Sequence, residues 1–393
     1  MRRCGCLLVA ILGLCAARPG LGQFSDTEPA KTKAGQTGKP ALPPGGPAGA
    51  APKSDPSPAE PAAGAAEGTP HAPSVPPPSS PQPVEPPAVA DDQGKLRCQR
   101  GMVIRAVGGS FHAIVGTMAV PDNLPGEQQV RVVAEDIPPG ASVRYRTLEG
   151  GTRQMAISLS SLAAGKQVRV AVTFEVAVLP AAPLPADLAE YTAPDPARLD
   201  RKLAPFLAPS PLIESNRAEV TRLAAEITAD QKTALEKIKA IHAWVYENIK
   251  FELPADPREL SEVGRQGVLE TIKKRSGVCT GKNSAAVGLL RAAKIPARLV
   301  RVASSASYEH CYYEFCLLDG EGHPAWIAAD ASATAQLQPR IGSRGAVILQ
   351  KGDNVLVPSP RGTSRVRQRF LETTLSGLPN TPGAKLELKM IGQ

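Results

Sequence analysis

The chain has 393 residues, which is enough for two or three domains. It carries 45 basic and 37 acidic residues, and the two signs are interspersed without a long run of either. Aromatic residues make up only 4% of the chain, so few rings are available to stack on bases, and no nucleic-acid partner is expected.

The N-terminus has the features of a secretory signal. Arg2 and Arg3 precede an apolar run over residues 7–17 that ends in small residues. This run is too short for an ordinary transmembrane helix. We therefore expect a signal peptide over 1–22, no transmembrane span in the mature chain, and secretion into a periplasm, the cell envelope or beyond. A lipid anchor on Cys15 and retention of the run as an anchor are the alternatives.

Residues 23–95 consist mainly of proline, alanine, glycine and serine with scattered charges. Such a segment cannot bury enough apolar area to offset the loss of chain entropy on folding. We expect a disordered linker that holds the folded part away from its point of attachment. A proline-rich ligand for a partner domain is the alternative.

Residues 96–182 alternate apolar and polar side chains with a period of two, as in strands. Turn sequences rich in proline and glycine separate these short runs. The segment predicts a small, antiparallel, all-β sandwich-like domain. The clearest inward face comprises Val168, Val170, Val172, Phe174, Val176 and Val178.

Residues 195–338 change to helical periodicity and then return to strands. Apolar stripes predict two helices before a third that begins near Cys279 and ends before Pro296. Strand-like runs follow at 298–303, 310–318 and 325–330, the last two forming a hairpin. The tail, 339–393, is a β extension whose strand-like segment VILQKGDNVLVP completes or extends this sheet.

Cys279 lies where a thiol can be activated. A cysteine attacks as the thiolate, and its ordinary pKa is about 8.5. A helix N-terminus favours an anion, because its free N–H groups and the helix dipole point at it. Cys279 follows Gly277 at the predicted start of a helix, so the sequence places it in such a position.

His310 and Asp330 supply the other two parts of a nucleophilic site. His310 opens a strand and Asp330 closes the next one, so a hairpin makes them cross-strand neighbours. An imidazole beside the thiol stabilises the thiolate, and a carboxylate fixes the imidazole's orientation. Cys279, His310 and Asp330 are therefore the candidate catalytic residues. The alternative for Cys279 is a small buried apolar side chain at a helix start.

Other residues give no sign of a metal or cofactor. No CxxC pair or Cys/His cluster has zinc spacing, and no acidic loop resembles a calcium site. Cys311 and Cys316 face opposite sides of a strand, so they cannot form a disulfide with each other. Cys98, if it is exposed, could pair with another thiol in an oxidising compartment. The histidine of the helix before the cysteine, His242, is expected at a packing boundary.

The region around Cys279 resembles the transglutaminase-like superfamily. The matching motifs are SGVCTGKNSAAVGLLRAAKIPARLVRV and, further on, YEHCYYEFCLLDGEGHPAWIAADAS. The resemblance covers about residues 215–335. It implies an α+β class with a papain-like core, in which the cysteine helix packs on an antiparallel sheet. It also implies Cys279 as nucleophile, His310 as general base and acid, and Asp330 as orienting residue.

The chain departs from this family's pattern at three positions. Lys294 stands where the family commonly has glycine at the helix C-terminus, which implies local strain. Cys311 and Tyr312 replace the usual Ala-Trp after the histidine, which bears on substrate contacts more than on the triad. The backbone N–H of Cys279 is the natural first oxyanion donor, and the side chain of Gln266 is a candidate for the second.

Two functions are compatible with these features. The first is a secreted cysteine acyl-transfer enzyme acting on protein or peptide amides, with hydrolysis favoured because no amine-binding site is evident. The second is a non-catalytic module of the cell envelope, in which the β domain of 96–182 binds a wall or protein partner. The complete Cys-His-Asp set ranks the enzyme first.

Overall fold

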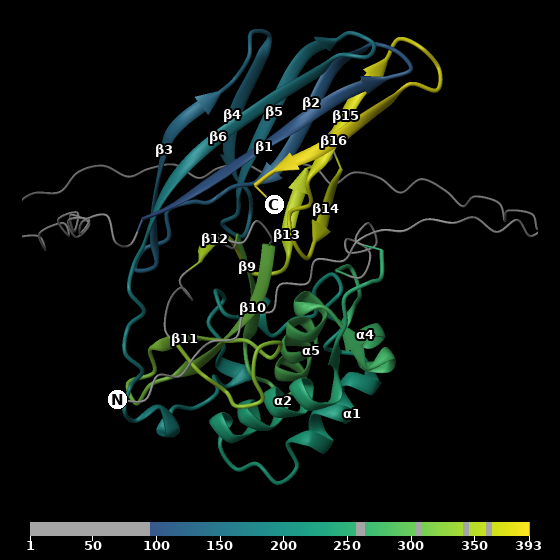
Figure 1. Ribbon diagram of the computed structural model, residues 1–393. Coiled ribbons are helices and arrows are strands. Elements are labelled where there is room, and N and C mark those ends of the chain that lie inside the picture. Colours follow the sequence, from purple (N-terminus) through teal and green to yellow (C-terminus); the bar gives the residue numbers. More distant parts are fainter. Residues whose placement is uncertain (1–94, 257–263, 304–308, 341–345, 359–363, 393) are drawn as a thin grey trace, which may run out of the picture. The chain divides into compact units, whose positions relative to one another are not determined.

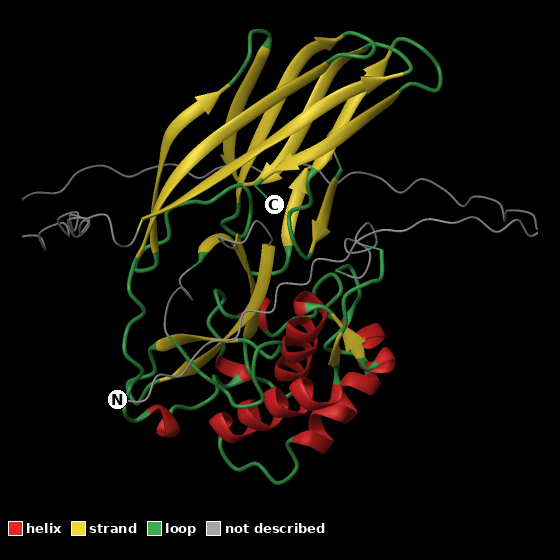
Figure 2. Ribbon diagram, viewed as in Figure 1, coloured by secondary structure: helices red, strands yellow, loops and turns green. Residues whose placement is uncertain are grey.

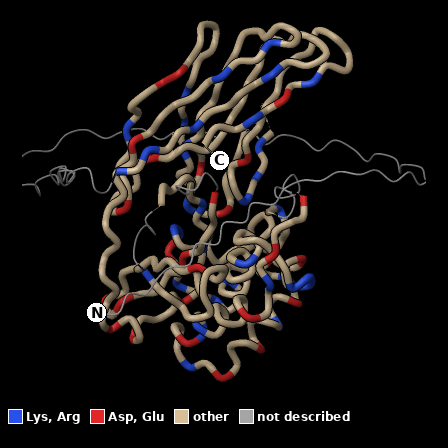
Figure 3. Tube along the Cα trace, viewed as in Figure 1, with Lys and Arg blue, Asp and Glu red and all other residues tan. Residues whose placement is uncertain are grey.

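The structure is a computed structural model that describes residues 95–256, 264–303, 309–340, 346–358 and 364–392. Apart from two strands of two residues each between the helices, helices and longer strands occupy separate stretches of the chain, which confirms the predicted α+β class (Figures 1 and 2). Basic and acidic residues are interspersed along the described parts of the chain (Figure 3). The predicted signal peptide, 1–22, and all but the last residue of the predicted linker lie outside the described residues. No helix in the described ranges has the length and apolar character needed to cross a bilayer.

Eight strands form a β-sandwich of two four-stranded antiparallel sheets (Figure 1). The first sheet has the order β16-β1-β6-β3, and the second has the order β15-β2-β5-β4. The strands are β1 (Lys95–Val107), β2 (Phe111–Ala119), β3 (Gln128–Asp136), β4 (Ala141–Thr147), β5 (Arg153–Leu162), β6 (Gln167–Val178), β15 (Thr374–Pro379) and β16 (Lys385–Ile391).

The sandwich core forms where the inward faces of the two sheets meet. Alternate residues of β6 are fully buried, as the period of two predicts: Val170, Val172, Phe174 and Val176. They share one apolar cluster with residues of the opposite sheet such as Ile114 and Met118. Burial of this face fixes the register of β6, because a slip by one residue would turn these side chains to solvent.

The tail, 339–393, extends more than the one sheet that its segment VILQKGDNVLVP was predicted to complete or extend. Only β12 (Val347–Lys351) joins that sheet, whereas β15 and β16 pair with β2 and β1 of the sandwich. The sandwich is therefore larger than the predicted segment 96–182. Within that segment β1 pairs only with β6, and β2 only with β5, so each has a second edge that a strand from the tail fills.

The other lobe contains a four-stranded antiparallel sheet of order β11-β10-β9-β12. Its remaining strands are β9 (Ala297–Ala303), β10 (Glu309–Leu318) and β11 (Pro324–Ala329), and its helices are α1 (Ala218–Ile227), α2 (Ala234–Asn248), α4 (Val268–Lys274) and α5 (Cys279–Ala292). Helix α5 packs on β9 and β10 and is flanked by α1, α2 and α4 (Figure 1). Two short pairs complete the described strands: β7 (Lys250–Phe251) with β8 (Ser276–Gly277), and β13 (Val355–Pro358) with β14 (Arg365–Gln368).

Helix α5 is buried along its length, since every residue from 281 to 291 is buried. Its C-terminus turns at Lys294, which has a left-handed φ of 67°. The N–H of Ile295 donates to the carbonyl of Leu290 and closes the turn. A side chain in this conformation costs on the order of 1 kcal/mol, so the strain expected from lysine at the family's glycine position is present.

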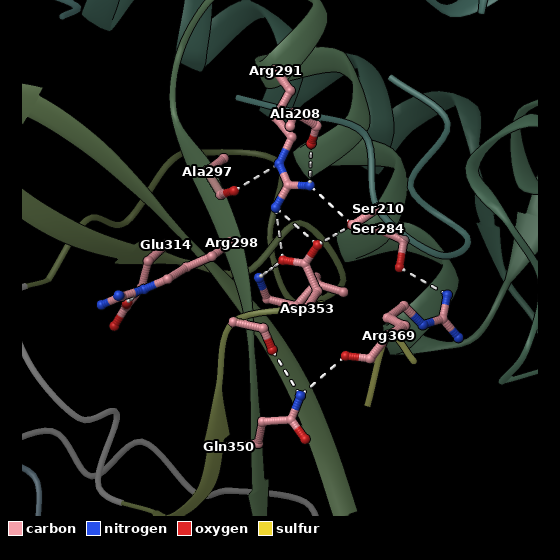
Figure 4. A network of polar contacts seen from close by, with 12 residues as sticks. Ala208, Ser210, Ser284, Arg291, Ala297, Arg298, Glu314, Gln350, Asp353 and Arg369 are labelled. Carbon is pink, nitrogen blue, oxygen red and sulfur yellow. Dashed lines mark hydrogen bonds and ion pairs between the residues drawn. The ribbon is translucent and has the colours of Figure 1, made fainter. Parts of the chain in front are cut away.

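Arg291 at the end of α5 is the centre of a buried polar network (Figure 4). Nη2 of its guanidinium donates to both carboxylate oxygens of Asp353 at 2.8 Å, and neither side chain is more than 1% exposed. Asp353 also accepts from the N–H of Leu299 and from the hydroxyl of Ser210. Arg298 pairs with Glu314 beside this network. The tail is thus bound to the cysteine helix by a charge pair that has no contact with water.

Replacement of Asp353 tests this anchoring. In Asp353→Ala the buried guanidinium of Arg291 loses its counter-ion, so we expect the free energy of unfolding to fall by about 3–5 kcal/mol. The measurement is urea denaturation followed by circular dichroism. The control is Glu372→Ala, which removes a surface ion pair with Arg265 and should cost less than about 1 kcal/mol. Equal losses in the two variants would contradict the anchoring role.

Candidate active site

Cys279 is the first residue of α5, and its side chain is half-buried. No side chain caps this end of the helix, because the residue before it, Val278, has no hydrogen-bonding group. The first N–H groups of α5 are therefore available to an anion at this position. The thiol also interacts with the backbone N–H of Cys311 and with the side chain of Thr280.

His310 and Asp330 come from neighbouring parts of the sheet. His310 is the second residue of β10, and Asp330 directly follows β11. The hairpin of β10 and β11 brings the imidazole Nε2 of His310 to 2.7 Å from Oδ2 of Asp330. The His310 side chain is 29% exposed and that of Asp330 is 4% exposed. The three residues singled out by the sequence thus lie together, with the histidine and cysteine facing solvent and the carboxylate behind them.

The thiol of Cys279 and the imidazole of His310 interact directly. Burial opposes ionisation of Cys279, but its hydrogen bond with His310 and the charge of the imidazolium outweigh burial and hold the thiol pKa below its ordinary value. Burial likewise disfavours the charged imidazole, yet Asp330 and Cys279 together raise the pKa of His310 to about 10. Both shifts favour a thiolate–imidazolium pair over the neutral pair.

Asp330 is held as a carboxylate by several donors. Its Oδ1 accepts from the Nδ2 of Asn283 at 3.0 Å and from the N–H and hydroxyl of Ser332 at 2.9 and 2.6 Å. Burial raises the pKa of Asp330, but its bonds to His310, Ser332 and Asn283 lower it well below its usual range. Since every oxygen has a partner, the carboxylate has a fixed direction and can orient the imidazole.

Asn283 is a site residue that the sequence analysis did not identify. It is fully buried one turn after Cys279, and its Nδ2 also lies 3.0 Å from the carbonyl of Cys279 and 2.9 Å from that of Cys311. Its Oδ1 accepts from the N–H of Ala331. Asn283 therefore links the helix that carries the cysteine to both strands that carry its partners. A polar residue on an apolar helix face, four residues after Cys279, was the available signal.

Gln266 lies beside the start of α5. Its side chain is buried, and its Oε1 has no hydrogen-bond partner. A methyl group built on Gly277 would lie 3.5 Å from this oxygen, and one built on Gly281 would lie 3.8 Å from it. The amide of Gln266 therefore lies beside both glycines, within contact range of any side chain placed there. The backbone carbonyl of Gln266 is fixed by a 2.9 Å hydrogen bond from Arg369.

The other described cysteines are poor nucleophiles. Cys98, Cys311 and Cys316 are buried, and no disulfide joins any of the four cysteines in the described ranges. Burial raises the pKa of each of these thiols, that of Cys316 to about 12. Cys98 is thus not the exposed thiol that the sequence left open. Cys279 is the one described cysteine whose surroundings favour the thiolate.

His242 has a structural role. It is fully buried, whereas a packing boundary was predicted. Its Nδ1 lies 2.9 Å from the hydroxyl of Tyr313, and its Nε2 lies 2.9 Å from the carbonyl of Thr334. Both ring nitrogens are therefore engaged in joining α2 to the sheet. Among the described residues, no group of three or more His, Cys, Asp or Glu side chains could hold a metal ion.

Comparison with known proteins identifies the region that carries this site. Residues 221–331 match the sequence model of the transglutaminase-like superfamily. The matched segment includes Cys279, His310 and Asp330. A search of the curated proteins finds no match to the chain.

Solved structures also resemble the chain. A proposed cysteine protease from Cytophaga hutchinsonii is 17% identical, with a TM-score of 0.49 over 76% of this chain and 93% of that one. A proposed protease from Parabacteroides distasonis is 12% identical, with a TM-score of 0.26 over 58% of this chain and 46% of that one. A TGase is 12% identical, with a TM-score of 0.23 over 49% of this chain and 45% of that one.

The shifted pKa values predict an unusual pH dependence for alkylation of Cys279. Because His310 lowers the thiol pKa, the rate with iodoacetamide should rise on the acid side of about 8.5, the value of a free thiol. A second change is expected near pH 10, where His310 loses its proton. The measurement is the rate at Cys279 between pH 4 and about 11, with the modified residue located by mass spectrometry.

His310→Ala is the matched variant for this experiment. Burial of Cys279 remains in the variant, but the charge and hydrogen bond that oppose burial are lost. The rise in rate should therefore move to at least about pH 8.5–9, and the change near pH 10 should disappear. Identical profiles in the two proteins would show that the thiol is not activated by His310.

Proposed function

We propose that the protein is a cysteine acyl-transfer enzyme that hydrolyses amide bonds in peptides or proteins. The observation that carries this proposal is the contact of Cys279, at an uncapped helix N-terminus, with an imidazole that Asp330 orients at 2.7 Å. This arrangement has the three parts that nucleophilic catalysis by a thiol requires: a stabilised thiolate, a proton carrier and a group that fixes the proton carrier.

The proposed reaction has two steps. The sulfur of Cys279 attacks the amide carbonyl and forms a C–S bond, and His310 gives its proton to the leaving amine as the C–N bond breaks. Water then attacks the thioester, and His310 takes a proton from it. The C–S bond breaks, the acid is released, and the thiolate–imidazolium pair returns. Asp330 keeps its charge in both steps and stabilises the imidazolium.

The negative oxygen formed in each step needs hydrogen-bond donors. We assign the backbone N–H of Cys279 as one donor and the side chain of Gln266 as the other. Two facts support Gln266: its amide lies beside Gly277 and Gly281 at the start of the cysteine helix, and its Oε1 is buried without a partner. A half-turn of the amide puts Nε2 at the position of Oε1, where it can act as a donor to the oxyanion.

Hydrolysis is preferred to transfer because water is always available, whereas transfer requires a bound amine. The signal-like N-terminus further supports action outside the cytoplasm, on a protein or peptide of the cell envelope or its surroundings. A binding module that has lost catalysis is the competing function. The satisfied hydrogen bonds of Asp330 and its 2.7 Å hydrogen bond with His310 favour the enzyme, because a degenerate site has no need of either.

Replacement of the nucleophile tests the proposal. The full chain is incubated with a mixture of unstructured peptides, and products are identified by mass spectrometry with and without a primary amine. Cleavage with uptake of water is expected in the native protein, and Cys279→Ala should lower kcat/KM on the order of 10⁴-fold or more.

The matched control is Cys98→Ala, which removes a buried thiol of the sandwich and should leave turnover unchanged. Amine incorporation in place of cleavage would show a transferase. Turnover that survives in Cys279→Ala would overturn the proposal. The proposal would also be overturned if the native protein shows no turnover and its Cys279 is alkylated with the pH profile of an ordinary free thiol.

A further inference from the structure

The first residue of β10 is held by two arginines from different parts of the chain. Arg100 of β1 donates from Nη2 to Oε1 of Glu309 at 2.9 Å, and Arg301 of β9 donates from Nε to Oε2 of Glu309 at 2.6 Å. We name Arg100, Arg301 and Glu309 the Glu309 clamp. Burial raises the pKa of Glu309, but the two guanidinium groups outweigh burial and lower it, so the clamp is ionised.

Arg100 has no exposed surface and is among the largest fully buried side chains of the described residues. Besides Glu309, it donates from Nε to the carbonyl of Ala119 at 3.3 Å and from Nη1 to the carbonyl of Gly392 at 3.1 Å. Two nitrogens of the guanidinium, Nε and Nη1, are therefore bound to the sandwich, and the third, Nη2, binds Glu309 of the catalytic sheet. Arg301 is fixed in turn by its bond to the carbonyl of Leu371.

The position of Glu309 in β10 gives the clamp its importance. Glu309 directly precedes His310, and the ladder between β10 and β11 begins only at Tyr313. At residues 309 and 310 the strand pairs with β9 alone, through Ala303 and Val302. Among the residues that the structure describes, no second strand lies beside the strand end that carries the imidazole. Successive side chains of a strand leave on opposite sides, so Glu309 holds the backbone while His310 projects away from it.

We propose that the Glu309 clamp makes the β-sandwich a positioning element of the active site, in which Arg100 sets the place of His310. This inference rests on the proposed function and extends it, because it gives the sandwich a role in catalysis in place of a separate binding role. A displacement of the imidazole by about 1 Å is enough to lower a rate about 100-fold. A rigid anchor on the preceding residue is therefore a requirement of the chemistry.

The test uses the full chain with Arg100→Met, which keeps an unbranched apolar stem, removes the guanidinium and leaves Glu309 paired with Arg301. The expected result is a fall of about 10-fold or more in the rate of alkylation of Cys279 at pH 6, with the rise in rate displaced toward the free-thiol value of about 8.5. If peptide hydrolysis has been detected, kcat should fall with KM nearly unchanged.

The matched control is Gln128→Leu. Gln128 is also a buried sandwich residue that contacts the catalytic sheet, with bonds to the N–H and carbonyl of Ile348 at 2.8 and 2.9 Å. Ile348 lies on β12, two strands away from β10. Loss of this contact should lower stability without changing the pH profile of Cys279. A general loosening of the two lobes would instead move the profile in both variants, and would overturn the proposal.

If Arg100→Met does not fold, Glu309→Gln is used to test the role of the clamp. It preserves the shape of the clamp but removes the charge, so a smaller displacement of the profile in the same direction is expected. A folded variant, Arg100→Met or Glu309→Gln, with the native profile overturns the proposal. An ordinary thiol profile in the native protein itself would instead overturn the proposed function, so the two failures are distinguishable.

Discussion

The fold depends on the burial of residues 281–291 of α5. A helix that is covered on all sides must find a partner for each polar side chain it carries, because an unpaired polar group in the interior costs several kcal/mol. Four polar residues lie in its buried stretch: Lys282, Asn283, Ser284 and Arg291. Their partners come from the end of α2, the residues after β11, and the C-terminal tail. The helix thereby determines which distant segments must be present and where each one lies.

The same burial explains why the candidate site is at the N-terminus of α5. Its first two residues, Cys279 and Thr280, are the only part of the helix before its last turn that is not fully buried. Reactive chemistry needs both a fixed group and access to substrate, and only this end offers them together. Asn283 sets the distance between the helix and the hairpin, and the Glu309 clamp sets the free end of β10. Buried polar contacts thus join the helix that carries Cys279 to the strand that carries His310.

The sequence was sufficient for those parts of the site that depend on local patterns. Three features follow from residues that are close in the chain: the glycine before Cys279, the apolar period after it, and the hairpin between β10 and β11. The sequence therefore predicted that the three candidate residues lie close together. Asp353 and Arg100 could not be foreseen, because their partners lie 62 and 209 residues away and no period marks them. The pairing of β15 and β16 was missed for the same reason: alternation gives the inward face of a strand but not its neighbour.

The charges around the triad show how a buried anion is tolerated there. The net charge of the triad is −1 both before and after a proton moves from Cys279 to His310. Before the transfer Asp330 carries this charge, and after it the thiolate and the imidazolium cancel each other. A buried cation inside α5 that feels the charge of Asp330 is Lys282, which is 2% exposed and donates to the carbonyls of Tyr246 and Ile249. Burial lowers the pKa of Lys282 while the charge of Asp330 raises it. The lysine and the N-terminal dipole of α5 therefore balance the triad's charge, so that proton transfer between sulfur and imidazole changes the position of charge within the site but not its total.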